Sequence, residues 1–218
     1  MIAAPLWFNA TFALLAKRFD YPDILRRPTE EILERFREGG SSLILLWWAF
    51  MLSGLLMVAA AVLLSQALGF GGVLPVATAV GILAGLVQML GLLRWVYLVP
   101  SLARAYVDPQ ASPAQREATA AIFRAFHQYL GVGVGEHLGY LLTGVWSILL
   151  GIAIALGDTL TVWLGWPGIL IGAGLAVGSA EFLGPNEEQG WALAGAAIPI
   201  LYIAWSIWLL GLGIALIV

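Results

Sequence analysis

Residues that could do chemistry are few in this chain, and they lie near the ends of long apolar segments. They comprise one arginine, two carboxylates, one histidine and one amide, which are Arg94, Glu136, Glu181, His137 and Gln88. If these segments cross a membrane, a charge within them costs at least about 2.5–3.5 kcal/mol on insertion scales, so each group needs a partner or a role. Such residues could bind a ligand through charge and hydrogen bonds, or could form a buried ion pair.

Two of the apolar segments carry polar and small residues at helical spacing. Intervals of three and four residues place one set on a single helical face, namely Tyr129, Gly133, Glu136, Tyr140, Thr143 and Ser147. A second segment repeats the pattern with Gly195, Pro199, Tyr202 and Ser206. Lipid cannot satisfy polar groups, so these stripes should face protein or a water-filled cavity. Because a proline at 199 frees a carbonyl and can kink the helix, we expect the stripes to line one cleft that opens towards the cytoplasm.

The composition indicates that lipid, rather than water, covers most of this chain. Of 218 residues, 61% are hydrophobic and only 11% are charged, whereas a soluble domain carries about 25% charged residues. The net charge is −3 and there is no basic tract, which argues against a nucleic-acid partner. The chain has no cysteine, so disulfides, thiolate metal sites, iron–sulfur clusters and cysteine catalysis are excluded.

Five apolar stretches reach the roughly 20 residues that a helix needs to cross about 30 Å of hydrocarbon. They cover residues 43–68, 73–99, 131–156, 160–182 and 191–217. Glycines and prolines bracket them, and Pro100 is expected to end the second stretch. The sequence therefore predicts an all-α, polytopic membrane helical bundle at 42–218, with about five transmembrane helices.

Residues 1–41 are predicted to form an interfacial and amphipathic segment on the cytoplasmic side. As a helix, the apolar stretch 3–16 is about 21 Å long, which is too short to span comfortably. It is interpreted as an interfacial helix, with a sixth span as the alternative. A short surface helix is predicted at 29–38. An amphipathic connector at 112–130 should begin with Ser112 as its cap and a proline in the first helical position.

The ten basic residues predict the orientation. Six precede the first span and four surround the connection between the second and third; they are Lys17, Arg18, Arg26, Arg27, Arg35 and Arg37, and Arg94, Arg104, Arg116 and Arg124. Because segments rich in lysine and arginine stay in the cytoplasm, both regions are assigned to the cytoplasmic side. The arginine, carboxylates and histidine named above then share one depth. There Arg94 could form a structural ion pair with Glu136 or Glu181, or could extend to the interface.

Small residues four positions apart recur in the predicted spans. The spacings are Gly81–Gly85, Gly168–Gly172 and Gly174–Gly178. Such spacings let helix backbones approach closely. We expect these glycines to pack helices within the chain, and a dimer face is the alternative.

Three stretches resemble a known family. They are RFDYPDILRRPTEEILERF at 18–36, GEHLGYLLTGVW at 135–146 and WLGWPGILIGAGLAVGSAEFLGP at 163–185. In these the chain resembles the domain-of-unknown-function 4386 family, which comprises uncharacterised bacterial multi-pass membrane proteins. The resemblance covers most of the chain and implies a bacterial inner-membrane location. It implies no activity, substrate or ligand.

The function predicted from these residues is non-enzymatic binding of a small lipophilic or amphipathic molecule in a cytoplasm-facing intramembrane cleft. The alternative is a structural or accessory subunit that docks on another membrane protein, or on a second copy of itself. An intramembrane enzyme is less favoured, because the adjacent Glu136 and His137 point about 100° apart on a helix and no catalytic motif is present. A transporter is also less favoured, since the five spans show no obvious inverted repeat.

The predicted ligand-binding residues are Gln88, Arg94, Glu136, His137, Tyr140, Thr143, Glu181, Tyr202 and Ser206. No catalytic or metal-binding residue is assigned. Two histidines are too few for a convincing all-protein metal site. No cofactor is implied, although a haem held by one histidine stays open as an alternative.

Overall fold

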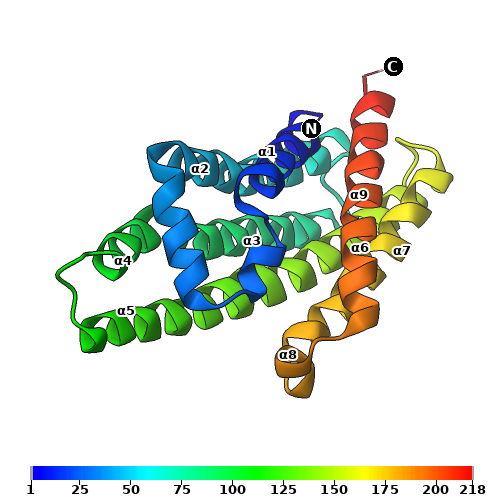
Figure 1. Ribbon diagram of the computed structural model, residues 1–218. Helices are drawn as coiled ribbons and strands as arrows, with labels where there is room; N and C mark the ends of the chain where they lie inside the picture. The colour runs from blue at the N-terminus through cyan, green and yellow to red at the C-terminus, as the bar shows by residue number, and fades with distance from the viewer. Residues whose placement is uncertain (1, 218) are drawn as a thin grey trace.

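The structure is helical throughout the part that it describes, which is residues 2–217 apart from the side chains of residues 187 and 188. It is a computed structural model. Five helical stretches are long and apolar enough to cross a membrane: Thr29–Ala67 (α2), Leu74–Tyr106, Pro113–Leu156, Val162–Phe182 and Ala192–Ala215 (α9). The predicted all-α membrane bundle with five spans is therefore confirmed, and Figure 1 shows its helices packed against one another.

Helix α2 bends sharply at Gly40. This glycine has a φ of 56° and a ψ of −153°, a conformation that a residue without Cβ adopts most easily. The bend separates a first arm, residues 29–39, from a second arm, residues 41–67, that runs through the bundle (Figure 1). The first arm corresponds to the surface helix expected at 29–38. Its apolar side chains Ile32, Leu33 and Phe36 are buried against the bundle.

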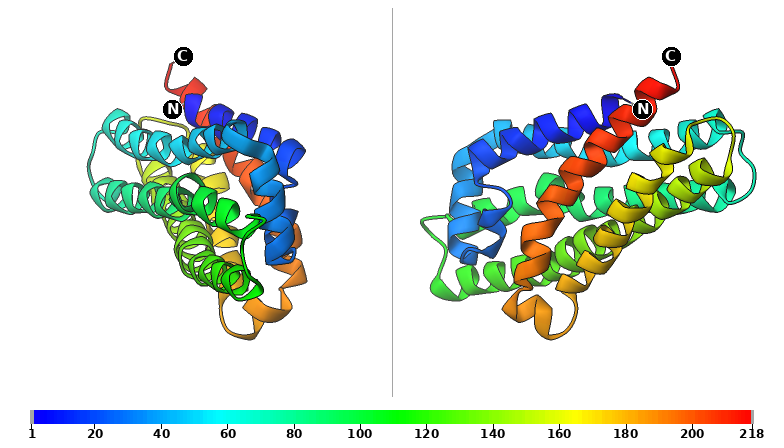
Figure 2. Two further views of the ribbon diagram at one scale, coloured as in Figure 1. Left: turned by 60° about the vertical axis from the view of Figure 1, so that its left-hand side comes forward. Right: turned by 90° about the vertical axis from the view of Figure 1, so that its right-hand side faces the viewer.

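Helix α1 (Ala3–Phe19) lies lengthwise against α2 and α9. Asn9 Nδ2 donates a hydrogen bond to Ser206 Oγ at 2.8 Å, and Ile2 packs over Gly213. Residue numbers therefore rise along α1 as they fall along α9, so the two helices are antiparallel. Figure 2 shows α1 beside the second arm of α2, with its first turn near the end of α9. The segment that the sequence assigned to the interface thus packs along two membrane-crossing helices.

The stretch Leu74–Tyr106 is continuous, and the prediction that Pro100 ends it is wrong. It comprises α3 (Leu74–Leu93), the π-helical turn η2 (Arg94–Leu98) and α4 (Val99–Tyr106). Pro100 lies in the first turn of α4, where a helix tolerates a missing N–H. The π-helical turn before it already alters the hydrogen-bond pattern, so the chain passes the proline without stopping.

The stretch Pro113–Leu156 is also continuous, so the connector predicted at 112–130 and the span predicted from 131 form one long helix. It comprises α5 (Pro113–Phe126), the π-helix η3 (His127–Leu138) and α6 (Gly139–Leu156). Its start is the predicted one: the Ser112 hydroxyl accepts from the backbone of Gln115, and the Gln115 side chain accepts from the backbone of Ser112.

The chain returns through α7 (Gly165–Gly178), which is flanked by the 3₁₀ turns η4 (Val162–Leu164) and η5 (Ser179–Phe182). A short helix, α8 (Pro185–Gln189), then leads into α9. This hairpin brings η5 and the start of α9 to the same end of the bundle, as the orange segments of Figure 2 show.

Glycines allow α6 and α7 to pack with their backbones close together. A Cβ added to Gly144 would lie 2.5 Å from the carbonyl oxygen of Gly172, so no larger residue fits without a shift. Among the glycines of the predicted spacings, Gly85 and Gly172 meet a backbone carbonyl in the same way, whereas Gly81, Gly168, Gly174 and Gly178 pack against side chains of this chain. Their predicted role in packing within the chain is supported by these contacts.

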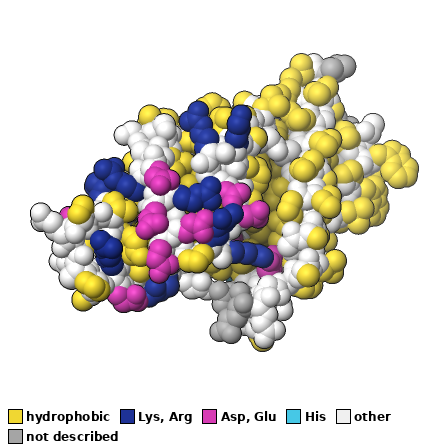
Figure 3. Space-filling view, in the orientation of Figure 1, with side chains coloured by type: hydrophobic (Ala, Val, Ile, Leu, Met, Phe, Trp, Pro, Cys, Tyr) yellow, Lys and Arg dark blue, Asp and Glu magenta, His cyan; other side chains and the backbone are white. Residues whose placement is uncertain are grey.

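Charged side chains gather at one end of the molecule. Figure 3 shows them over the first arm of α2 and the α4–α5 end, whereas the face beside α9 is largely hydrophobic. Beneath the charged end lies an aromatic core in which Trp47 and Trp95 stack with ring centroids 4.6 Å apart. A second core, around Trp146, Trp205 and Trp208, fills the opposite half of the bundle. The charged end is the end at which a cleft opens.

Candidate functional site

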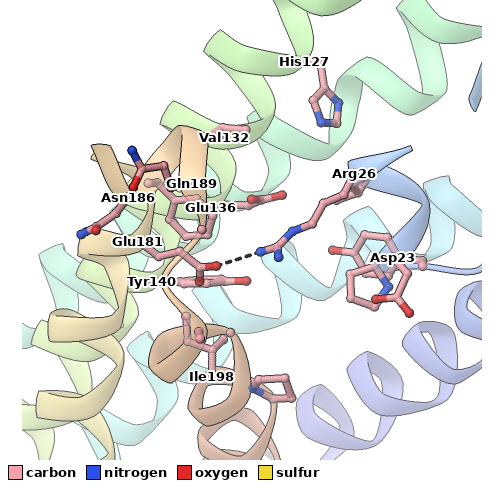
Figure 4. A pocket seen from close by; sticks show the side chains of 18 of the residues that line it. Asp23, Arg26, His127, Val132, Glu136, Tyr140, Glu181, Asn186, Gln189 and Ile198 are labelled. Carbon is pink, nitrogen blue, oxygen red and sulfur yellow. Dashed lines mark hydrogen bonds and ion pairs between the residues drawn. The ribbon is translucent and has the colours of Figure 1, made fainter. Parts of the chain in front are cut away.

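A cleft of about 720 Å³ opens between segments that are far apart in the sequence. Its walls come from Tyr21 and Pro22 with the 3₁₀ turn η1 (Asp23–Arg26), and from η3, η5, α8 and the first turns of α9. Figure 4 shows Arg26 reaching in from η1, opposite Glu136, Tyr140 and Glu181. The cleft is therefore closed on one side by the N-terminal segment and on the other by the bundle.

The π-helix η3 supplies one wall of the cleft. A π-helix is rare and appears mostly as single turns, frequently at functional sites. Here it runs over 12 residues and places His127, Val132 and Glu136 along the cleft, with Tyr140 following from α6. The stripe predicted on this helix does reach the cleft at Glu136 and Tyr140. Tyr129, from the same predicted stripe, is exposed on the surface.

The carboxylate of Glu136 lines the cleft without a protein partner. Among the described residues, no hydrogen bond to it is found and no cation lies within ion-pair distance. A carboxylate in such a position, within a membrane-crossing helix, has lost part of its water shell without gaining a counterion. It is therefore a side chain of this cleft that a cation or a hydrogen-bond donor would satisfy.

Glu181, by contrast, is paired. Its side chain is only 6% exposed, and its Oε1 accepts from Arg26 Nη2 at 2.7 Å (Figure 4). The Arg26 side chain is 72% exposed, so this pair joins a buried carboxylate of η5 to a surface arginine of η1 across the cleft. The pairing ties the N-terminal segment to the end of the fourth span.

Arg94 adopts neither of the arrangements expected from the sequence. It makes no ion pair with Glu136, Glu181 or any other described residue, and at 5% exposure it does not extend to the interface. Its guanidinium donates to the carbonyl of Gly91 and lies 5.2 Å from the centre of the Trp95 ring. The π-helical turn that carries Arg94 turns it behind η3, where a backbone carbonyl and an aromatic face replace the expected carboxylate.

The remaining predicted site residues lie outside this cleft. His137 Nδ1 is 2.9 Å from the carbonyl oxygen of Ser179, and Gln88 Nε2 donates to Thr143 Oγ1 at 2.9 Å. The other two predicted residues also lie deeper in the bundle: Tyr202 lines, with Gln88, a separate cavity of about 20 Å³, and Ser206 accepts from Asn9. The cleft thus follows the two predicted stripes only as far as Tyr140 and Pro199, and Gly195 lines it too.

Several cleft residues were not predicted from the sequence. They are Tyr21, Pro22, Asp23, Leu25, Arg26, His127, Gln128, Val132, Phe182, Asn186, Gln189, Gly190, Ala192 and Ile198. The segment 21–26 has no helical periodicity and precedes the first span, so only the folded chain brings it to the cleft. Burial, together with the charge of Glu136, raises the pKa of the Tyr21 phenol above its ordinary value, which keeps it a neutral hydrogen-bonding group.

The two histidines lie ten residues apart on η3 and face different surroundings. His127 lines the cleft, and its ring stacks on Phe123 with centroids 5.3 Å apart. Within the described part of the chain, no group of three or more histidine, aspartate or glutamate side chains is placed to hold a metal ion. The chemistry available in the cleft is therefore that of carboxylates, one arginine, one imidazole and aromatic rings.

Comparison with known proteins gives a family and no function. The sequence profile of a family described as "Domain of unknown function (DUF4386)" matches residues 1–213. No curated protein and no solved structure matches the chain.

Proposed function

We propose that this chain, which belongs to the DUF4386 family, binds a small amphipathic molecule in the cleft between η1, η3 and α9. The family itself has no assigned activity. The observation that carries the proposal is the cleft itself. Its volume of about 720 Å³ lies within the roughly 300–1,000 Å³ that is usual for small-molecule sites.

The lining of the cleft suits a molecule with one polar and one apolar end. Polar groups converge on one part of it, among them the Tyr21 hydroxyl and the Glu136 carboxylate. Apolar side chains, including Val132, Ile198 and Pro199, complete the wall. Because Ile198 and Pro199 belong to a membrane-crossing helix, an apolar tail in contact with them would lie at the depth of the lipid acyl chains.

Two observations favour binding over the alternatives. His137, the neighbour of Glu136, bonds to the carbonyl of Ser179 outside the cleft, so the two do not form an acid–base pair. The glycine spacings that suggested docking on another protein are occupied by contacts within the chain. A non-enzymatic ligand-binding protein of the bacterial inner membrane, with its cleft facing the cytoplasm, is consistent with both.

Photo-crosslinking from within the cleft tests this proposal. A photoreactive amino acid that replaces Val132 would face the cleft. The same photoreactive amino acid in place of Leu170, which is 68% exposed on α7, would face the outside of the bundle. Irradiated membranes should give an adduct of discrete mass at 132, whereas the control at 170 should give the mixture of bulk phospholipids. The intact mass of the purified chain measures both.

The proposal fails if position 132 gives no adduct, or only the phospholipid mixture seen at position 170. A cleft without a preferred occupant would expose Val132 to the same molecules as the outer surface. Equal crosslinking from both positions would therefore show that the cleft selects nothing.

A further inference from the structure

We infer that the molecule held in this cleft carries an ammonium group, and that Glu136 is the carboxylate that binds it. This inference rests on the proposed function and adds the chemical class of the ligand. It covers primary and quaternary ammonium groups attached to an apolar tail.

The charges that line the cleft favour a cation. Among the described residues they comprise three carboxylates, Asp23, Glu136 and Glu181, and one arginine, Arg26. Arg26 already forms an ion pair with Glu181, in which Nη2 lies 2.7 Å from Oε1. The half-buried Glu136 and the exposed Asp23 are then left without a cation in the cleft, so a ligand with a positive group would balance the site.

Arg94 does not remove this requirement. It is buried behind η3, with its guanidinium against Gly131, and its hydrogen bond goes to the Gly91 carbonyl instead of a carboxylate. Its charge therefore reduces the cost of ionising Glu136 through space, but leaves the carboxylate oxygens free to accept hydrogen bonds from a ligand in the cleft.

Aromatic rings complete an ammonium site. Tyr21, Tyr140 and Phe182 all line the cleft, and the Tyr140 and Phe182 rings are 5.4 Å apart in an edge-on arrangement. Aromatic faces attract ammonium ions, and a carboxylate surrounded by several rings is a common way to bind them. Tyr140 follows Glu136 by four residues, so the ring and the carboxylate lie one helical turn apart on the same side.

The same cleft is a poor site for a ligand with an anionic headgroup. Arg26 is the one described cation on the lining, and its Nη2 is already paired with the buried carboxylate of Glu181 at 2.7 Å. The anion would also lie among three carboxylates. The arrangement therefore disfavours sulfates, phosphates and fatty acids as free ligands.

Two sources could supply the ammonium group. One is a free amphipathic amine, and the other is the headgroup of an aminolipid such as phosphatidylethanolamine. In the second case the lipid phosphate would remain at the mouth of the cleft, near the exposed part of Arg26. The ammonium chemistry is shared, and the experiment below separates the sources.

The test uses the full chain purified in dodecyl maltoside, with octyltrimethylammonium and octyl sulfate as probes of equal tail length. Binding is followed by the thermal unfolding midpoint as a function of probe concentration. Glu136→Gln removes the charge in the cleft, and Glu34→Gln removes the same charge from an exposed site on the first arm of α2. Native mass spectrometry compares retention of phosphatidylethanolamine and phosphatidylglycerol.

We expect octyltrimethylammonium to bind at least tenfold more tightly than octyl sulfate. Glu136→Gln should weaken ammonium binding at least tenfold, and Glu34→Gln should leave it unchanged. Selective retention of phosphatidylethanolamine, lost in Glu136→Gln, supports the lipid source. Tight ammonium binding without any lipid preference supports the free amine.

Equal or tighter binding of octyl sulfate overturns the inference, and so does an unchanged ammonium affinity in a folded Glu136→Gln variant. If that variant does not fold, the comparison of the two probes on the natural chain still decides. A discrete adduct at position 132 combined with no ammonium preference would retain the cleft as a binding site and reject only the ligand class.

Discussion

At the scale of residues, the side chain that distinguishes this molecule is Arg94. It is buried inside a membrane bundle, yet its stabilising contacts come from the Gly91 carbonyl and the Trp95 ring. Its guanidinium occupies the space beside Gly131, which has no side chain. A Cβ at position 131 would lie 2.5 Å from Arg94 Nη2, so the guanidinium would have to shift to admit one. The position of the guanidinium therefore depends on the absence of a side chain on η3.

Gly131→Ala should consequently destabilise the fold. The guanidinium cannot move away without losing its contacts, so we expect a loss of about 1–3 kcal/mol, as is usual for overpacking. Gly133→Ala is the matched control on the same π-helix, since its Cβ would meet its nearest neighbour at 3.6 Å, an ordinary contact. Unfolding of both variants in detergent measures the difference. Equal stability of the two would show that Arg94 is free to move.

At the scale of elements, two helices differ from what periodicity predicts. Pro100 was expected to end a helix, but the π-helical turn of η2 lets the chain continue. The glycines at 131, 133 and 135 lie in η3, which stays helical and only widens. In both cases the backbone changes its hydrogen-bond spacing instead of stopping, and hydrophobic periodicity carries no signal for that change.

Helix α1 is the element whose relation to the bilayer is most open to experiment. Because it lies lengthwise against α2 and α9, its outward side chains Leu6 (55% exposed) and Leu14 (45% exposed) should face acyl chains. Cysteines at these positions should react with a water-soluble maleimide as slowly as one at the outward-facing Leu170. A cysteine at Glu34 should react quickly. The natural chain has no cysteine, so each variant carries a single label site.

An α1 that lies flat at the interface would behave differently. One side of such a helix faces water, so at least one of the two leucine positions would label as fast as position 34. That result would favour the interfacial location predicted from the length of residues 3–16.

At the scale of the whole molecule, the sequence predicts what depends on length and composition. Five long apolar stretches are enough to predict five spans, and the glycine spacings predict close packing within the chain. Chain parity predicts Glu136 and Glu181 at one depth, and both line the same cleft in the structure. The partner of Glu181 could not be predicted, since Arg26 reaches it only through the fold of a segment without periodicity.

The orientation of the bundle is the remaining whole-molecule property, and the basic residues predict it. If the charged end faces the cytoplasm, a cysteine at Asn186, beside the cleft, should be shielded in intact cells and should label only after the membrane is permeabilised. A cysteine at Asp158, in the exposed turn between α6 and η4, should label in intact cells with an impermeant maleimide. The reverse pattern would place the mouth of the cleft outside, and an ammonium ligand would then have to come from the opposite side or leaflet of the membrane.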